Sequence, residues 1–317
     1  MSYGSESVET IAGQDAMFRF MQVAVVIAIA ALPARTLQAA PVASAAAGDA
    51  RVVVYPSSGR DNDSRGNYYV SLLKLALARS DAAFDVQPSK QATVTLRALA
   101  AMAEGHGIDV IWAPNVTTIG PEFLPVRIPV DHGILGWRIF LIDKRDSDTF
   151  ASVRSLDQLK AWPAGQVAEW ADTTIMRANG IPVVEATLYE SLFPMLAAHR
   201  FRYLPRGIGE IEGEARNYAS LGLAVESHLA FHYPYCTYFY VSRSNGELAH
   251  QIEIGLRRMQ KDGSLEALFQ KFNGPAIQRA ELGRRTVFEL TNPLIGPDGA
   301  SAKDRCVDSG NAIFHAN

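Results

Sequence analysis

The sequence predicts an α/β protein of two lobes, each a mixed, mostly parallel sheet flanked by helices. Short β-branched and aromatic runs alternate with segments of helical periodicity, which is typical of parallel sheets. The alternation starts again after an apolar strand at residues 137–142, which indicates a second α/β unit. The chain has 317 residues, enough for two ordinary domains. Its 48% hydrophobic and 20% charged residues are typical of a soluble globular protein.

The first unit is expected to contain three strands and two helices. A β-branched run at residues 51–55 is followed by the loop Pro56-Ser57-Ser58-Gly59, so it is predicted to be a strand. Residues 84–87 and 108–113 are predicted as further strands, the latter apolar enough to be buried on both faces. Helical spacing predicts helices at 68–79 and around 96–103.

The second unit is expected to follow the strand at 137–142. Ser155 and Gln158 form a capping box before a short helix. Asp172 is expected to cap the next helix and Gly180 to end it. Further strands are predicted at 166–169, 183–184, 203–204, 221–225 and 235–242. Further helices are predicted at 189–196, between the strand at 203–204 and Tyr218, at 247–262 and at 264–272.

These elements divide the chain into four parts. Residues 1–47 are expected to serve export, and residues 296–317 to form a C-terminal tail. The first lobe is predicted to comprise residues 48–142 and 240–295, and the second lobe residues 143–239. The chain is therefore expected to cross between the lobes twice.

The N-terminus has the order of a secretory signal peptide. Arg19 precedes an apolar run at residues 20–32, and the small residues Ala43-Ser44-Ala45 follow. The run is shorter than the ~20 residues that span a bilayer, so a retained anchor is the weaker alternative. Residues 1–16 carry acidic side chains and no Lys or Arg, so we predict that translation starts at Met17. We expect the protein in the periplasm.

The chain has two cysteines, Cys236 and Cys306. In an oxidising compartment this pair can form one disulfide between a strand and the C-terminal tail. Alternatively, Cys236 is a small buried hydrophobic residue. The spacing of the two residues leaves both alternatives open.

The order of elements resembles the type 2 periplasmic binding proteins, in particular the family 3 extracellular solute-binding proteins of ABC-type transporters. The resemblance covers residues 51–290 and is most specific at 247–272, which resembles the closing helices of that family with Asp-Gly-Ser between them. Residues 155–159 and 237–242 resemble the start of the second lobe and the return crossover. The resemblance implies a hinge with two crossovers, closure on a ligand and delivery to a membrane transporter.

The chain departs from the members of this family that bind amino acids. The family pattern of Thr with Arg three residues later is broken, because Thr117 and Thr118 are followed by Ile119-Gly120-Pro121. Where the family places an acidic residue for the ligand's amino group, the chain has Arg206-Gly207, and this cation would repel an ammonium. These departures argue against an ordinary amino acid as ligand. Arg284-Arg285 and Asn292-Pro293-Leu294 resemble an uncharacterised branch of the family.

Candidate ligand contacts lie in loops at the carboxyl ends of strands, where open parallel sheets bind ligands. Arg206 suits a carboxylate or phosphate, and the alternative is an ion pair with Glu210 or Glu212. Thr173 at a helix start can hold an anionic group, unless Asp172 only caps that helix. The predicted contacts are Tyr55, Ser57, Trp112, Asn115, Trp170, Thr173 and Arg206, of which the two tryptophans could instead be packing residues.

Sequence motifs of enzymes and metal sites are incomplete. Residues 207–213 nearly match a dinucleotide fingerprint, but the last glycine comes one residue late and two glutamates would oppose a pyrophosphate. His228 and His232 are spaced i, i+4, but they lack the glutamate of a zinc-protease helix and do not complete a metal site. We therefore expect no catalytic residue, no metal and no cofactor.

The sequence thus predicts a periplasmic solute-binding protein that closes on a small ligand with a negative or strongly polar group. The expected partners are this ligand and an inner-membrane transporter or a sensor kinase, and we expect a monomer. The net charge of −3 without a basic stripe argues against nucleic-acid binding. Two alternatives stay open, an extracytoplasmic sensor or adaptor and a dehydratase-like enzyme on the same fold.

Overall fold

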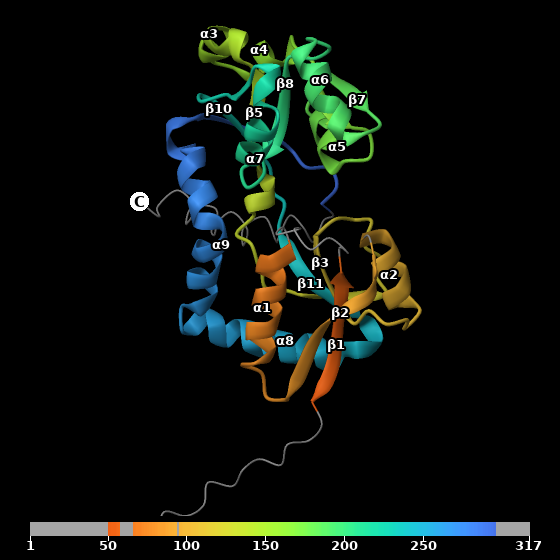
Figure 1. The fold of residues 1–317 in the computed structure, drawn as a ribbon. Coiled ribbons are helices and arrows are strands. Elements are labelled where there is room, and N and C mark those ends of the chain that lie inside the picture. The colour runs from red at the N-terminus through yellow and green to blue at the C-terminus, as the bar shows by residue number, and fades with distance from the viewer. Residues whose placement is uncertain (1–49, 58–65, 94, 296–317) are drawn as a thin grey trace, which may run out of the picture. The chain divides into compact units, whose positions relative to one another are not determined.

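The structure is a computed structural model that describes residues 50–57, 66–93 and 95–295 (Figure 1). The export region 1–47, with the predicted start at Met17, lies outside the described residues, as do Cys306 and the tail 296–317. The predictions for these segments therefore stay predictions.

Lobe 1 is built on a three-stranded sheet of order β3-β11-β4 and a two-stranded parallel sheet, β1-β2. Both pairings in the three-stranded sheet are antiparallel. The strands are β1 (Arg51–Ser57), β2 (Phe84–Ala92), β3 (Val110–Pro114), β4 (Phe123–Val126) and β11 (Thr237–Ser242); the helices are α1 (Asn67–Leu77), α2 (Thr95–Ala103), α8 (Gly246–Lys261) and α9 (Ser264–Ala280).

Lobe 2 is built on a seven-stranded mixed sheet of order β12-β10-β5-β8-β6-β7, with β9 paired to β5. The central strand β5 runs antiparallel to β8 and β10, and this register places Arg138 opposite Gly207. The strands are β5 (Trp137–Asp143), β6 (Ala164–Val167), β7 (Val183–Ala186), β8 (Tyr203–Gly207), β9 (Leu223–Val225), β10 (Leu229–His232) and β12 (Thr286–Glu289); the helices are α3 (Ser147–Ala151), α4 (Leu156–Lys160), α5 (Ala171–Ala178), α6 (Leu192–Ala197) and α7 (Ile211–Asn217).

The positions of β5 and β11 locate two of the crossings between the lobes. All of β5 pairs within the sheet of lobe 2, and all of β11 pairs within the sheet of lobe 1. The chain therefore passes between the sheets at residues 127–136 and 233–236. We propose these segments as the lobe boundaries in place of 142/143 and 239/240, because a strand belongs to the sheet with which it pairs.

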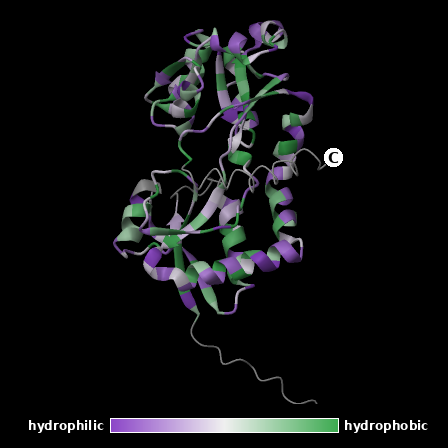
Figure 2. Cartoon of the chain, turned by 180° about the vertical axis from the view of Figure 1, so that it is seen from behind, coloured by the Kyte–Doolittle hydropathy of each residue, from purple (hydrophilic) through white to green (hydrophobic). Residues whose placement is uncertain are grey.

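The two cores explain why these segments fold as they do. In lobe 1, Leu72 and Leu73 of α1 are fully buried, as are Ile252 and Leu256 of α8. Gly255 permits this close approach, because a Cβ there would lie 1.9 Å from the Ala76 carbonyl oxygen. In lobe 2 the rings of Phe140, Tyr203 and Phe231 pack with centroids 4.7–6.2 Å apart. Figure 2 shows hydrophobic residues in the strands and hydrophobic and hydrophilic residues alternating along the helices.

Local signals in the sequence had different outcomes. The capping box of Ser155 and Gln158 is confirmed, and Gly180 follows α5 at φ 75°, as expected for a helix stop. The prediction that Asp172 caps α5 is wrong. Trp170 is the N-cap residue, and Asp172 lies in the first turn of the helix. Its carboxylate accepts hydrogen bonds from Arg138 and Tyr233. Both donors are distant from Asp172 in the sequence, so the sequence does not indicate these contacts.

Candidate functional site

A cavity of about 770 Å³ lies between the two lobes. Lobe 1 contributes aromatic residues and the first strand loop, and lobe 2 contributes Arg138 and the segment from Gly207 to Glu210. Helix α9 forms a further wall through Phe272, Pro275 and Arg279. A cavity with walls from both lobes can hold a small molecule that touches each of them.

One side of the cavity is a continuous series of aromatic rings from lobe 1. Tyr55 and Trp112 have centroids 6.1 Å apart, and Trp112 stacks on Tyr69 at 5.6 Å. Tyr69 lies 5.2 Å from Tyr68, which in turn lies 5.9 Å from Phe272. Such a surface offers a flat apolar face to a ligand, and its ring faces attract positive groups.

Asp131 fastens the first crossover to lobe 1 beside the cavity. It lies in the first crossover and is fully buried. Its carboxylate accepts hydrogen bonds from the Thr237 hydroxyl at 2.5 Å, the Thr237 N–H at 3.2 Å, the Tyr69 hydroxyl at 3.1 Å and the Gly133 N–H at 3.2 Å. Burial raises the pKa of Asp131, although these donors oppose the rise. A saturated carboxylate of this kind serves the structure of the hinge.

Arg138 is the cation of lobe 2 that lines the cavity. Its Nε and Nη2 donate to Asp172 at 2.6 and 3.2 Å, and its Nη1 donates to the carbonyls of Leu135 and Trp137. The Tyr233 hydroxyl donates to the same Asp172 carboxylate at 2.6 Å. Burial alone would raise the pKa of Asp172, but Arg138, with the Tyr233 hydroxyl and the charge of Arg206, lowers that pKa. This buried pair connects β5 to the first turn of α5.

Arg206 does not line the cavity and is only 8% exposed. Its Nε donates to both oxygens of Glu214 at 2.9 and 2.8 Å, and its Nη2 donates to Glu214 at 2.7 Å and to Glu210 at 2.8 Å. The guanidinium also lies over the rings of Trp170, at 4.6 Å, and Tyr189, at 5.4 Å. Its charge is therefore balanced within lobe 2, and the acidic partners are Glu210 and Glu214.

The predicted ligand contacts divide into two groups. Tyr55, Ser57 and Trp112 line the cavity, whereas Asn115, Trp170, Thr173 and Arg206 do not. The Thr173 hydroxyl donates to the Val167 carbonyl at 2.8 Å, and the Asn115 backbone N–H donates to the Cys236 carbonyl at 2.9 Å. The structure thus brings three of the predicted residues together at one cavity, and ligand contact by any of the seven stays a prediction.

Sequence reasoning did not select several residues of the cavity. Tyr68 and Tyr69 have the spacing of a core helix face, which hides their place at the cavity wall. Arg138 was detectable, because it is a lone charge within an apolar strand and such a residue needs a partner. For Glu210, the sequence indicates only an ion pair with Arg206. Arg279 falls beyond the predicted end of its helix.

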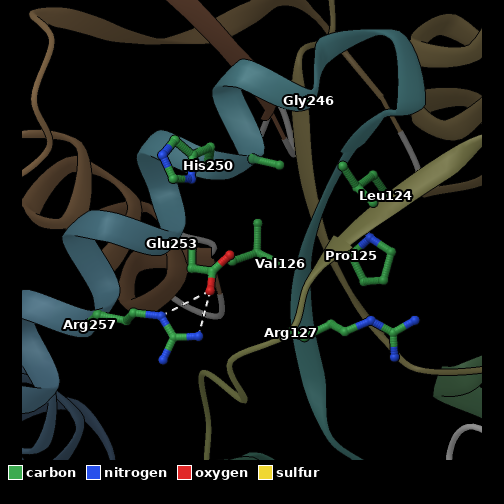
Figure 3. A pocket seen from close by; sticks show the side chains of 9 residues that line it. Leu124, Pro125, Val126, Arg127, Gly246, His250, Glu253 and Arg257 are labelled. Atoms are coloured by element: carbon green, nitrogen blue, oxygen red, sulfur yellow. Dashed lines mark hydrogen bonds and ion pairs between the residues drawn. The ribbon is translucent and has the colours of Figure 1, made fainter.

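A second hollow of about 480 Å³ lies on lobe 1 between α8 and β4 (Figure 3). His250, Glu253 and Arg257 of α8 line it, together with Pro125 of β4 and Arg127, which follows β4. Glu253 pairs with Arg257 at 2.5 Å. None of the predicted ligand contacts lies here, and only one lobe contributes to it, so the interlobe cavity is the better candidate site.

Three further findings concern the described residues. No helix among them is long and apolar enough to cross a membrane. Within the same ranges, no cluster of His, Cys, Asp and Glu is suited to hold a metal ion. Cys236 is buried and is not a free thiol.

Comparison with known proteins gives a match at the level of structure. No protein-family model and no curated protein matches the chain. The probable amino-acid ABC transporter extracellular-binding protein YtmK from Bacillus subtilis aligns with a TM-score of 0.55 and 15% identity, over 71% of this chain and 98% of that one. YckB, also from Bacillus subtilis, aligns with a TM-score of 0.51 and 19% identity, over 76% of this chain and 96% of that one.

A third similar structure is the periplasmic VFT2 domain of BvgS from Bordetella pertussis. It aligns with a TM-score of 0.50 and 15% identity, over 70% of this chain and 93% of the other. At such identities the likeness concerns the fold. The predicted fold is confirmed: the chain has the two-lobed fold of type 2 periplasmic binding proteins.

Proposed function

We propose that the protein is a solute-binding protein that captures a small polar ligand by hinge closure and delivers it to an ABC-type transporter. The observation that carries the proposal is the cavity of about 770 Å³ with walls from both lobes. A ligand that contacts both walls favours the closed state over the open one. The described residues offer binding surfaces, and we propose no catalytic step.

We propose further that the ligand combines a flat part with an anionic group. The flat part would lie against Trp112 and Tyr55. Arg279 supports the anionic group, because it is exposed at the cavity and forms no ion pair with a described residue. Arg138 and Arg206 already have carboxylate partners, so Arg279 is the cation with donors to spare.

A thermal-shift screen with amino acids, small carboxylates and carboxylated aromatic rings tests this function. We expect at least one of these compounds to raise the melting temperature of the wild-type protein, and Trp112→Ala to reduce its affinity at least about tenfold, because a stacked ring is lost. Trp162→Ala is the matched control, since Trp162 packs on Phe150, 5.1 Å away, and does not line the cavity. Equal affinity of the wild type and Trp112→Ala would refute the proposed site.

The same screen tests the anionic group of the ligand. Arg279→Ala should weaken a carboxylated compound and leave its neutral amide unaffected, because only the ionised group gains from the guanidinium. Arg284→Ala is the control, since Arg284 is also exposed and pairs with Glu281 away from the cavity. A carboxylated compound that binds both variants with equal affinity would show that its anionic group does not contact Arg279.

A sensor or adaptor function is the second candidate, and the likeness to the VFT2 domain of BvgS favours it. We propose a periplasmic protein in either case, with an export region at residues 1–47 and a disulfide between Cys236 and Cys306. N-terminal sequencing of the exported protein distinguishes the two functions. A cleaved N-terminus near residue 47 supports a released binding protein, whereas a retained apolar segment supports an anchored sensor with a partner kinase.

A further inference from the structure

The chain makes a third covalent connection between the lobes, at residues 281–285, where α9 ends and β12 begins. We propose that α9 and β12 together form a strut across the cavity, which limits how far the lobes separate, with Pro275 as the joint where the strut bends. Figure 1 shows α9 (blue) running from the end of α8 towards the region of β10. This inference goes beyond solute binding and does not depend on the identity of the ligand.

The first half of α9 is fixed to lobe 1 and to the first crossover. Phe269 is buried, and its ring lies 5.9 Å from that of Tyr68 in α1. His132 of the crossover packs edge-on against Phe269 at 4.5 Å, and its Nε2 lies 3.0 Å from the Glu266 carboxylate. These contacts hold the helix start against the hinge.

The strand that follows α9 is fixed to lobe 2. β12 pairs in parallel with β10 over the whole strand, from Thr286 opposite Leu229 to Glu289 opposite His232. The Arg285 side chain holds the junction between α9 and β12 by hydrogen bonds. Its Nε donates to the Ala280 carbonyl at 2.6 Å, and its Nη1 donates to the carbonyls of Glu226 and Leu229. The end of the helix therefore moves with lobe 2.

The segment after β12, residues 290–295, makes further contacts with both lobes and with the second crossover. Thr291 and Asn179 exchange two hydrogen bonds of 2.8 and 2.9 Å, so lobe 2 holds the segment there. The Asn292 side chain donates to the Pro234 carbonyl in the second crossover at 2.9 Å. The Leu294 carbonyl then accepts a bond from the Thr117 N–H of lobe 1 at 2.8 Å. This segment touches both lobes without lining the cavity.

The middle of α9 is its weakest point. Pro275 lies inside the helix, and proline has no N–H to donate to the carbonyl four residues earlier. Sharp bends in helices occur at such residues. Phe272, Pro275 and Arg279 line the cavity, so this part of the helix faces the site. A helix of 17 residues is about 25 Å long and does not stretch, so separation of the lobes requires it to bend or β12 to detach.

Distances between the lobes test the strut without any ligand. Spin labels attached through Arg97→Cys in α2 and Thr149→Cys in α3 report the distance distribution in the full chain, since both positions are exposed and Cys236 is not a free thiol. A short Gly-Ser insertion after Gly283 slackens the strut and removes no side chain, and Gly283 is exposed with no atom within 4 Å of a Cβ built there. The insertion interrupts the turn in which the Arg284 N–H donates to the Glu281 carbonyl at 2.9 Å and the Arg285 N–H donates to the Leu282 carbonyl at 3.1 Å. We expect a longer mean distance and a broader distribution. The same insertion after Gly105, an exposed turn within lobe 1, should change neither.

Pro275→Ala provides the opposite test in a protein without an insertion. Alanine restores the backbone donor and stiffens the helix, so the distribution should become narrower than in the wild type. Unchanged distances after the Gly283 insertion would overturn the strut. A distribution that stays the same or broadens in Pro275→Ala would overturn the joint. Thermal melts of each variant show that the compared proteins are folded.

Discussion

At the scale of single residues, Arg206 shows how partners change the role of a charge. The sequence presents a cation after a buried strand, which suits an anionic ligand. In the structure, Glu214 and Glu210 take up its donors, and Trp170 covers one face of the guanidinium. A buried charge with such partners is retained for structure as readily as for binding. The repulsion of an ammonium that the sequence predicts at this position is correspondingly reduced.

Arg206→Ala is expected to destabilise the protein by about 3–5 kcal/mol, because it leaves the buried Glu214 carboxylate without its cation. Denaturant unfolding measures this loss. Arg216→Ala is the control, and it should stay within about 0.5 kcal/mol of the wild type, since Arg216 is exposed and lies 3.9 Å from Glu212. Replacing both partners, Arg206→Met with Glu214→Leu, should recover much of the stability. A loss of less than about 1 kcal/mol in Arg206→Ala would contradict the structural role.

Asp143 makes stability depend on pH. Its carboxylate accepts hydrogen bonds from the Arg145 side chain at 3.0 and 2.6 Å, which lowers the pKa of Asp143 to about 2. A carboxyl whose pKa is lowered by folding stabilises the protein at pH values above its pKa in the unfolded state. This contribution is lost as the pH falls towards the pKa in the folded state. The stabilisation by Asp143 is therefore lost as the pH falls from about 4 to about 2.

We predict that Asp143→Asn lowers the melting temperature at neutral pH and that its difference from the wild type shrinks as the pH falls through this window. Melting curves over the pH range measure both effects. Asp157→Asn serves as the control, because the Asp157 side chain is 89% exposed. A constant difference between Asp143→Asn and the wild type from neutral pH to about pH 2 would contradict the assignment.

At the scale of elements, prediction from the sequence succeeded where periodicity was strong. The strands near residues 51, 84, 108 and 137 and the helices of α1 and α8 lie where their spacing indicates. The helix predicted at 264–272 extends to Ala280 and contains Pro275, whereas the sequence favours a stop before this proline. β4, β10 and β12 are only four residues each, so periodicity gives them little signal.

The packing of α1 against α8 gives a prediction at this scale. Gly255→Ala should destabilise the protein by about 1–3 kcal/mol or more, because the new Cβ would lie 1.9 Å from the Ala76 carbonyl oxygen. Gly213→Ala in α7 is the control, since a Cβ there meets nothing within 4 Å. Chemical denaturation compares the two. A Gly255→Ala protein as stable as Gly213→Ala would show that the helices do not approach as closely as described.

At the scale of the whole molecule, the order of elements predicted two lobes with a hinge, and the fold confirms this. The site was only partly predictable. Tyr55, Ser57 and Trp112 were predictable, because they lie in β1 and β3, and both strands follow from local features of the sequence. Arg138, Glu210 and Arg279 reach the cavity through the register of β5 with β8 and the length of α9, which depend on contacts between distant segments.

A crystal structure with the compound that gives the largest thermal shift tests the central claim most directly, which is that one ligand contacts both lobes. The account predicts that this compound lies in the interlobe cavity, against the ring of Trp112 on one side and near Arg138 and the segment from Gly207 to Glu210 on the other. A compound bound instead in the hollow between α8 and β4, with the interlobe cavity occupied only by water, would contradict the account.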